Sequence, residues 1–135
     1  MDCLPILQRV LAEEPHVELA VLFGSRASGR ATSASDVDLG LRFAPDASSA
    51  QRQSLSNVLE RALGAPLDLI DLDEAPPLLR MELARSGVVV KEAKPGSWTS
   101  FRARAMLDWW DFAPYARRIQ RAAIARLEGS ERGAR

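Results

Sequence analysis

Apolar and polar positions change their spacing along the first third of the chain, and these changes predict its elements. Apolar residues three or four positions apart indicate a helix over 3–13, and the apolar run over 16–23 predicts a strand that ends at Gly24. Residues 36–43 predict a second strand. The segment 26–35 between the two strands is small and polar, which indicates a tight helical turn followed by a loop.

A helix and a third strand follow. Ser48, with Gln51 three residues later, predicts a capping box at the start of a helix that Gly64 ends. Apolar residues at helical spacing are expected to form its buried face: Leu55, Val58, Leu59, Ala62 and Leu63. Residues 66–72 then predict a strand that is apolar on both faces, as expected for a sheet that helices cover.

The remaining pattern predicts two helices and one strand. The prolines at 76–77 begin a short helix that Gly87 ends, and residues 88–90 predict a fourth strand. From Ser97 onwards a long helix carries one apolar stripe, formed by Trp98, Phe101, Ala105, Trp109 and Phe112. Pro114 is expected to kink or restart this helix, because proline cannot donate the helical hydrogen bond.

This order of elements predicts a compact α/β domain, with a core over 1–95 and a C-terminal helical extension over 96–135. A chain of 135 residues with 47% hydrophobic and 27% charged residues is typical of one globular domain that needs no disulfide. Cys3 is the only cysteine, and no stretch resembles a secretory signal or an apolar span of about 20 residues. We therefore expect a cytoplasmic protein with no membrane contact.

The net charge of zero is unevenly distributed. Residues 1–101 carry 10 Lys and Arg against 14 Asp and Glu, whereas residues 102–135 carry 8 Arg against 4 acidic residues. Domains that bind phosphate backbones usually present a larger and more continuous basic surface. We expect the basic tail to be a solvated helix face or a protein contact, and we expect no direct binding of nucleic acid. Trp110, which lies off the apolar stripe, indicates either packing or a partner contact.

Three aspartates are candidates for the chemistry. Asp36 and Asp38 are two residues apart on a predicted strand, so their side chains point to the same face. Asp68 lies inside the third predicted strand, where burial of an unpaired carboxylate would cost several kcal/mol. If the second and third strands are neighbours, the carboxylates converge, and two charges about 4 Å apart repel by roughly 4 kcal/mol. A divalent cation would turn that repulsion into a binding site.

The donor set favours magnesium or manganese over zinc, because the ligands are oxygens and no His or Cys cluster is present. Mg²⁺ typically binds one or two carboxylates and completes its shell with water and phosphates, which suits a phosphoryl-transfer site with two ions. Asp68 is expected to lie nearest the attacking hydroxyl. Gly24 and Ser25, directly after a strand, permit close approach of the backbone to a phosphate. Arg26 or Arg30 would neutralise the outer phosphates.

The string from Gly24-Ser25 to Asp36-Val37-Asp38 resembles the GS(x10)DxD signature of the DNA polymerase β-like nucleotidyltransferase superfamily. Its compact form is similar to that of minimal nucleotidyltransferases, and Asp68 occupies the position of the third acid. The likeness continues through Asp71-Leu72 to Gly87-Val88 and into the segment Asp108 to Phe112. The most similar subgroup is the antitoxin that pairs with a HEPN-domain RNase toxin.

The resemblance implies a mixed four-stranded sheet flanked by helices, with ATP as donor and Mg²⁺ held by Asp36, Asp38 and Asp68. It also implies a hetero-oligomer with a HEPN toxin, in which AMP is placed on a tyrosine of the toxin. Two alternatives stay open. The chain is an antitoxin that acts by binding alone, or it transfers a nucleotide to a small molecule such as an aminoglycoside-type antibiotic. The short segment after the fourth strand argues against the small molecule, because such enzymes usually have a second helical domain around the acceptor.

Overall fold

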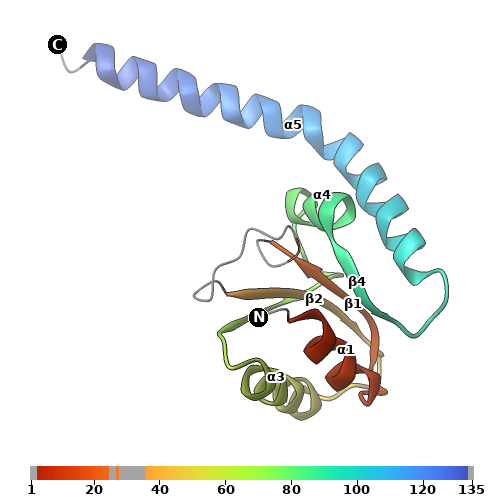
Figure 1. Cartoon of the computed structure of the whole chain (residues 1–135). Helices are drawn as coiled ribbons and strands as arrows, with labels where there is room; N and C mark the ends of the chain where they lie inside the picture. Colours follow the sequence, from red (N-terminus) through yellow and green to blue (C-terminus); the bar gives the residue numbers. More distant parts are fainter. Residues whose placement is uncertain (1–2, 25–26, 28–35, 134–135) are drawn as a thin grey trace.

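A mixed sheet between two helical layers forms the body of the protein (Figure 1). The computed structural model describes residues 3–24, 27 and 36–133. In chain order the described elements are α1 (Leu4–Ala12), β1 (Val17–Phe23), β2 (Val37–Phe43), α3 (Ser49–Leu63), β3 (Leu67–Asp71), α4 (Pro77–Ser86), β4 (Val88–Glu92) and α5 (Ser97–Gly133). The strands are ordered β3-β2-β1-β4, with β1 antiparallel to both neighbours and β2 parallel to β3. The predicted mixed sheet with flanking helices is confirmed.

Each face of the sheet buries its own core. Helices α1 and α3 cover one face, where they bury Leu7, Leu11, Val17, Ala20, Leu22, Val37, Leu39, Leu41, Leu55, Leu59 and Leu63. Helix α4 and the first half of α5 cover the other face, where they bury Leu19, Val21, Phe23, Leu72, Leu83, Ala84, Phe101 and Ala105. Full burial of one leucine or phenylalanine side chain stabilises a fold by about 1.5–3 kcal/mol. The two cores therefore hold the sheet rigidly between its helical layers.

The helix α3 begins and ends as the sequence predicts. The backbone N–H of Gln51 donates to Oγ of Ser48 (3.1 Å), and the N–H of Ser48 donates to Oε1 of Gln51 (2.8 Å). The helix ends at Gly64, whose φ of 62° lies in the left-handed region. Its buried face is narrower than expected, because Val58 and the side chain of residue 62 are exposed. Only every fourth residue of α3 faces the sheet.

The position of β3 corrects one expectation. The sequence suggested a strand that helices cover on both faces, but β3 forms an edge of the sheet and its side chains are only partly buried. Asp68 is exposed. The predicted cost of burying its carboxylate therefore does not arise, because an edge strand leaves the carboxylate in contact with water.

A lysine from β4 fixes the end of α1. The Nζ of Lys91 donates to the backbone oxygens of Leu11 (2.9 Å) and Glu14 (2.6 Å). Each of these carbonyls also accepts a backbone N–H, from Glu14 and Val17 respectively, so the lysine adds a second, charged donor to each and complements the helix dipole. Burial lowers the pKa of Lys91 below its ordinary value, against the opposing effect of Glu14. This contact locks α1 onto the sheet edge that β4 forms.

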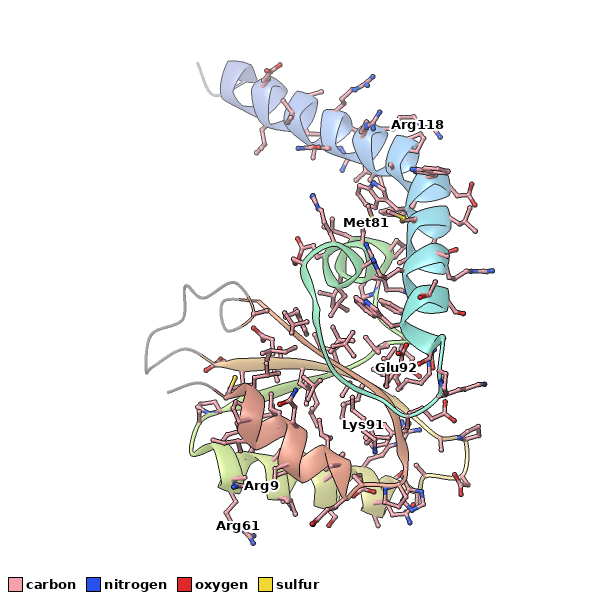
Figure 2. All side chains as sticks on the ribbon, turned by 45° about the vertical axis from the view of Figure 1, so that its right-hand side comes forward. Arg9, Arg61, Met81, Lys91, Glu92 and Arg118 are labelled. Atoms are coloured by element: carbon pink, nitrogen blue, oxygen red, sulfur yellow. The ribbon has the colours of Figure 1, made fainter. Side chains whose placement is uncertain are left out.

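The helix α5 has two halves with different surroundings. Its first half is joined to α4 by an ion pair between Arg80 and Asp108 (3.0 Å) and by a hydrogen bond from Nε of Arg102 to the oxygen of Ala84 (3.0 Å). The helix is continuous through Pro114, so it does not restart there, and its axis changes direction part-way along (Figure 1). Beyond the bend, the second half extends away from the body (Figure 2).

Among the described helices, none combines the length and the apolar character needed to cross a bilayer.

Candidate active site

Two of the three candidate aspartates lie side by side on neighbouring strands. Asp38 of β2 and Asp68 of β3 are direct partners in the parallel register. Neighbouring strands lie about 4.8 Å apart, so the two side chains leave the sheet next to each other. Ile70, two residues after Asp68, packs into the core under α4 and α5. Because side chains alternate along a strand, both carboxylates project on that same face.

Negative charge is concentrated around Asp38. Burial raises the pKa of Asp38 above its ordinary value, and the carboxylates of Asp68 and Asp36 raise it further. Asp36 directly precedes β2 and is exposed, as is Asp68, whereas Asp38 is half-buried. The site therefore consists of one partly desolvated carboxylate with two acidic neighbours that solvent and ligands can reach.

Gly24 ends β1 directly beside Asp38. Phe23, the last residue of β1, is the antiparallel partner of Asp38 in β2. Gly24 has a φ of 74°, a conformation that other residues rarely adopt, and a Cβ placed on it would collide with Oδ2 of Asp38. Only glycine therefore lets the chain turn at this point and leave Asp38 unobstructed.

The buried Phe23 was not among the residues that the sequence singled out. Its ring is 8% exposed and lies on the strand position opposite Asp38. Apolar surface next to a carboxylate reduces its hydration, which is the largest cause of the raised pKa of Asp38. The signal was present in the sequence, because the residue before Gly24 ends an apolar strand.

Ser25, Arg26 and Arg30 lie outside the described residues. The predicted turn and loop over 26–35 fall in the same part of the chain, apart from residue 27. Gly24 and Asp36 bracket this segment, so both of its ends are placed at the same end of the sheet as Asp38 and Asp68. The predicted phosphate-binding role of the segment stays a prediction.

The described carboxylates fit a hard divalent cation that brings its own further ligands. Within the described part of the chain, no three His, Cys, Asp or Glu side chains form a ready-made metal cluster. Mg²⁺ does not require such a cluster, since it usually binds one or two carboxylates and takes water and phosphate oxygens for the rest. The mutual repulsion that raises the pKa of Asp38 is the kind that a bound cation relieves.

Other notable residues lie away from this site. The single histidine, His16, is next to the start of β1, the opposite end from Gly24, and its Nε2 lies 2.9 Å from Nε2 of Gln51. Asp108 pairs with Arg80 between helices. Trp110 is 71% exposed, so it does not pack within the chain. These positions exclude all three residues from the chemistry of the aspartate pair.

Two cavities that described residues line are also separate from the aspartates. One, of about 340 Å³, lies between α1 and α3 and includes Val10 and Leu55. The other, of about 390 Å³, lies between α3 and the strands β2 and β3 and includes Phe43 and Arg52. Both are on the face of the sheet opposite Asp38 and Asp68. Neither therefore belongs to the candidate active site.

Comparison with known proteins identifies the family of the chain. A family model described as "Polymerase beta, Nucleotidyltransferase" matches residues 6–95, which include all of the described candidate residues. No curated protein matches the chain.

Several solved structures with similar folds are toxin–antitoxin structures. A structure of a toxin–antitoxin with AMP-PNP superimposes with a TM-score of 0.76 at 21% identity, covering 90% of this chain and 98% of that one. A structure of the toxin–antitoxin MntA-HepT gives a TM-score of 0.67 at 20% identity, with 89% and 94% covered. A structure of a tri-AMPylated HEPN toxin with its MNT antitoxin, from Shewanella oneidensis, gives 0.69 at 18% identity, with 90% and 98% covered. At these identities the likeness establishes the fold.

Proposed function

Because the chain belongs to the polymerase β nucleotidyltransferase family, we propose that it transfers AMP from ATP to a hydroxyl group on another protein. The observation that carries this proposal is the direct pairing of Asp38 with Asp68 beside Gly24. Structures of similar fold support the donor and the kind of acceptor, since one holds AMP-PNP and another contains a tri-AMPylated toxin.

The acceptor that we propose is a tyrosine hydroxyl of a HEPN RNase toxin, with which the chain forms a hetero-oligomer and acts as antitoxin. The MntA-HepT and HEPN–MNT complexes support this assignment, because their folds match nearly the whole of this chain. A protein acceptor also suits the exposure of Asp68, since an edge strand is open to a large partner.

Each candidate residue has a role in this proposal. Gly24 and Ser25 bring backbone N–H groups to the triphosphate, and Arg26 or Arg30 neutralises its outer phosphates. Asp36, Asp38 and Asp68 would hold Mg²⁺. When bound, Mg²⁺ would supply positive charge against the triphosphate and the leaving pyrophosphate.

The transfer itself exchanges the phosphoanhydride bond between the α- and β-phosphates of ATP for a phosphodiester bond to the acceptor. The acceptor oxygen forms a bond to the α-phosphorus of ATP while the bond from that phosphorus to the bridging oxygen breaks, and pyrophosphate leaves. Asp68 accepts the proton of the attacking hydroxyl. Asp38, one strand further into the sheet, is held rigidly by register on both sides and fixes the position of the nucleotide.

Label transfer from α-³²P-ATP to the co-encoded HEPN-type protein tests this function. We expect the wild-type chain to label the partner, and the double variant Asp36→Ala/Asp38→Ala to lose at least about 100-fold in rate. Asp46→Ala is the matched control, because this exposed aspartate lies at the opposite end of the sheet near His16. Equal labelling by the double variant and the wild type would refute the assigned site.

The two alternatives give different results in the same assay. Antitoxin action by binding alone predicts that the double variant still protects cells from the toxin while it transfers no label. A small-molecule acceptor predicts faster turnover with an aminoglycoside than with the HEPN-type protein. We expect neither result.

A further inference from the structure

The second half of α5 is a helix without a partner in this chain. We call residues 114–129 the arm. All of its side chains are exposed except that of Ala116, which is half-buried, and Tyr115, Ile119 and Leu127 are 55%, 52% and 68% exposed. Packing of an apolar face supplies most of the stability of helices in proteins. The arm therefore carries apolar surface for which the body offers no contact.

The apolar stripe of the arm continues the stripe that packs on the body. Ala116, Ile119, Ala123 and Leu127 recur at intervals of three or four residues, in phase with Trp109 and Phe112. Aromatic contacts join the two parts, since the rings of Trp109 and Phe112 are 6.1 Å apart and those of Phe112 and Tyr115 are 6.2 Å apart. The same spacing extends back to Phe101 and Ala105, which α5 buries against the face of the sheet on which Asp38 and Asp68 project, so the stripe continues the line of residues that contacts this face.

The direction of the arm agrees with this placement. In both views the arm extends past the body on the side where β1 ends and β2 begins (Figures 1 and 2). Arg118, labelled in Figure 2, lies just beyond the bend, with its guanidinium 5.9 Å from the ring centroid of Tyr115. A partner seated against the stripe would therefore lie between the arm and the end of the sheet that holds the aspartates.

The width of the stripe favours a helix as the occupant. Alanines alternate with Ile119 and Leu127, which gives a narrow seam that lets a second helix approach to the usual 8–10 Å. A helix that lies in a membrane surface usually has a broad apolar face with several bulky side chains. The phosphates of a nucleic acid would pair with the arginines, but they would leave the apolar seam uncovered.

The charge of the arm favours an acidic partner over a second copy of the arm. The arm, residues 114–129, contains four arginines against one glutamate. Two such arms side by side would repel each other, whereas carboxylates beside an apolar seam on another protein would be attracted. Arg126 lies close to the edge of the stripe, within reach of such carboxylates.

We propose that the arm is a docking surface for an acidic, amphipathic helix of the acceptor protein, which it holds over the aspartate end of the sheet. The proposal rests on the function proposed above, because it takes the acceptor to be a protein. Docking on the arm would raise the local concentration of the acceptor hydroxyl near Asp68 and Gly24.

Two isoleucines of the arm provide a matched test. Ile119 belongs to the stripe, whereas Ile124 is about 1.4 turns further on and faces another side, although it is exposed to a similar extent, 49% against 52%. We expect Ile119→Asp to weaken binding to the co-encoded HEPN-type protein by at least ~10-fold in isothermal titration calorimetry, and Ile124→Asp to change it by less than ~2-fold. Circular dichroism and the melting temperature check that both variants keep the fold.

The outcomes separate the two proposals. If Asp36→Ala/Asp38→Ala binds normally but transfers no label, while Ile119→Asp does not bind, both proposals hold. Equal binding by the two isoleucine variants would overturn the docking surface and leave the transferase function in place. No binding by the wild type would remove the protein acceptor itself. Binding of the arm to vesicles of phosphatidylglycerol and phosphatidylcholine, or dimerisation in light scattering, abolished by Ile119→Asp alone, would overturn the acidic helix as occupant.

Discussion

Asp38 combines two properties that oppose each other. It is held between Phe23 and Asp68 by register on both sides, and it carries a charge that burial and two neighbouring carboxylates disfavour. A group that is less stable in its charged form costs the fold stability at neutral pH. The charge of Asp38 therefore serves the proposed function but lowers the stability of the fold.

Replacing Asp38 by asparagine should separate the two properties. Asp38→Asn keeps the shape and removes the charge, so in EDTA at pH 7 we expect a melting temperature above that of the wild type. Because the folded pKa of Asp38 is raised, its penalty is absent below the ordinary value of about 4 and grows as pH rises through the folded pKa. Melting curves from pH 3 to 8 should show the gain disappearing at acid pH, while label transfer falls at least about 100-fold. A gain that persists at pH 3 would contradict this electrostatic cause.

The turn at Gly24 gives a second prediction at this scale. Gly24→Ala introduces a Cβ that collides with Oδ2 of Asp38 and forces a left-handed conformation that costs about 1–2 kcal/mol. We expect a lower melting temperature and a loss of label transfer of at least ~10-fold. Gly129→Ala is the matched control, because an added Cβ there meets nothing within 4 Å and alanine favours a helix. Normal transfer by Gly24→Ala would show that the loop does not need this turn.

The attachment of a single helix to the sheet can depend on a few hydrogen bonds to residues that are distant in the sequence. The end of α1 is a clear case, because both of its hydrogen bonds to Lys91 come from a strand 77–80 residues later in the chain. This contact joins α1 to a strand that is distant in the sequence, so a residue of the helix itself cannot supply it.

Removal of this lysine should therefore loosen α1. Lys91→Met keeps the length of the side chain but removes the charged donor from two carbonyls that each keep one backbone donor, which should lower the free energy of unfolding by ~1 kcal/mol in urea titration. Lys94→Met serves as the comparison, since Lys94 is exposed and should change stability by less than ~0.5 kcal/mol. If the two variants unfold alike, the cap does not contribute to stability.

The sequence predicted elements well where the cause is local. The capping box at Ser48 and the end of α3 at Gly64 follow from side-chain and backbone chemistry within a few residues. The pairing of Asp38 with Asp68 followed from treating their strands as neighbours. The edge position of β3 depends on strand order, which no local pattern encodes, and so the exposure of Asp68 was not foreseen. Likewise, the spacing of Ile119 and Leu127 predicts an apolar stripe but not what the stripe contacts.

At the scale of the whole molecule, the body and the arm differ in what holds them. The body has two buried cores, and α5 contributes Phe101 and Ala105 to one of them. Ala113 is the last buried residue of α5 in the described part of the chain. The cooperative unit should therefore end near Pro114.

Deletion of residues 115–135 tests this division. We expect the shortened chain to unfold cooperatively with a melting temperature within ~3 °C of the full chain, because the removed side chains bury little surface. Phe101→Ala in the full chain should instead cost about 3–5 kcal/mol, since its ring is 1% exposed. Differential scanning calorimetry compares the two directly. A shortened chain that fails to fold would show that the arm stabilises the body.

The short edge strand β3 has a consequence for solubility. Its outer side pairs with no other strand among the described residues, and Leu67, Leu69 and Ile70 are the kind of residues that recruit strands from other molecules into aggregates. Asp68 and Asp71 place negative charges within this aggregation-prone segment. The carboxylate of Asp68, which we assign to proton transfer, should therefore also disfavour aggregation through this edge strand. An apolar residue at position 68 would promote aggregation whether or not the reaction takes place.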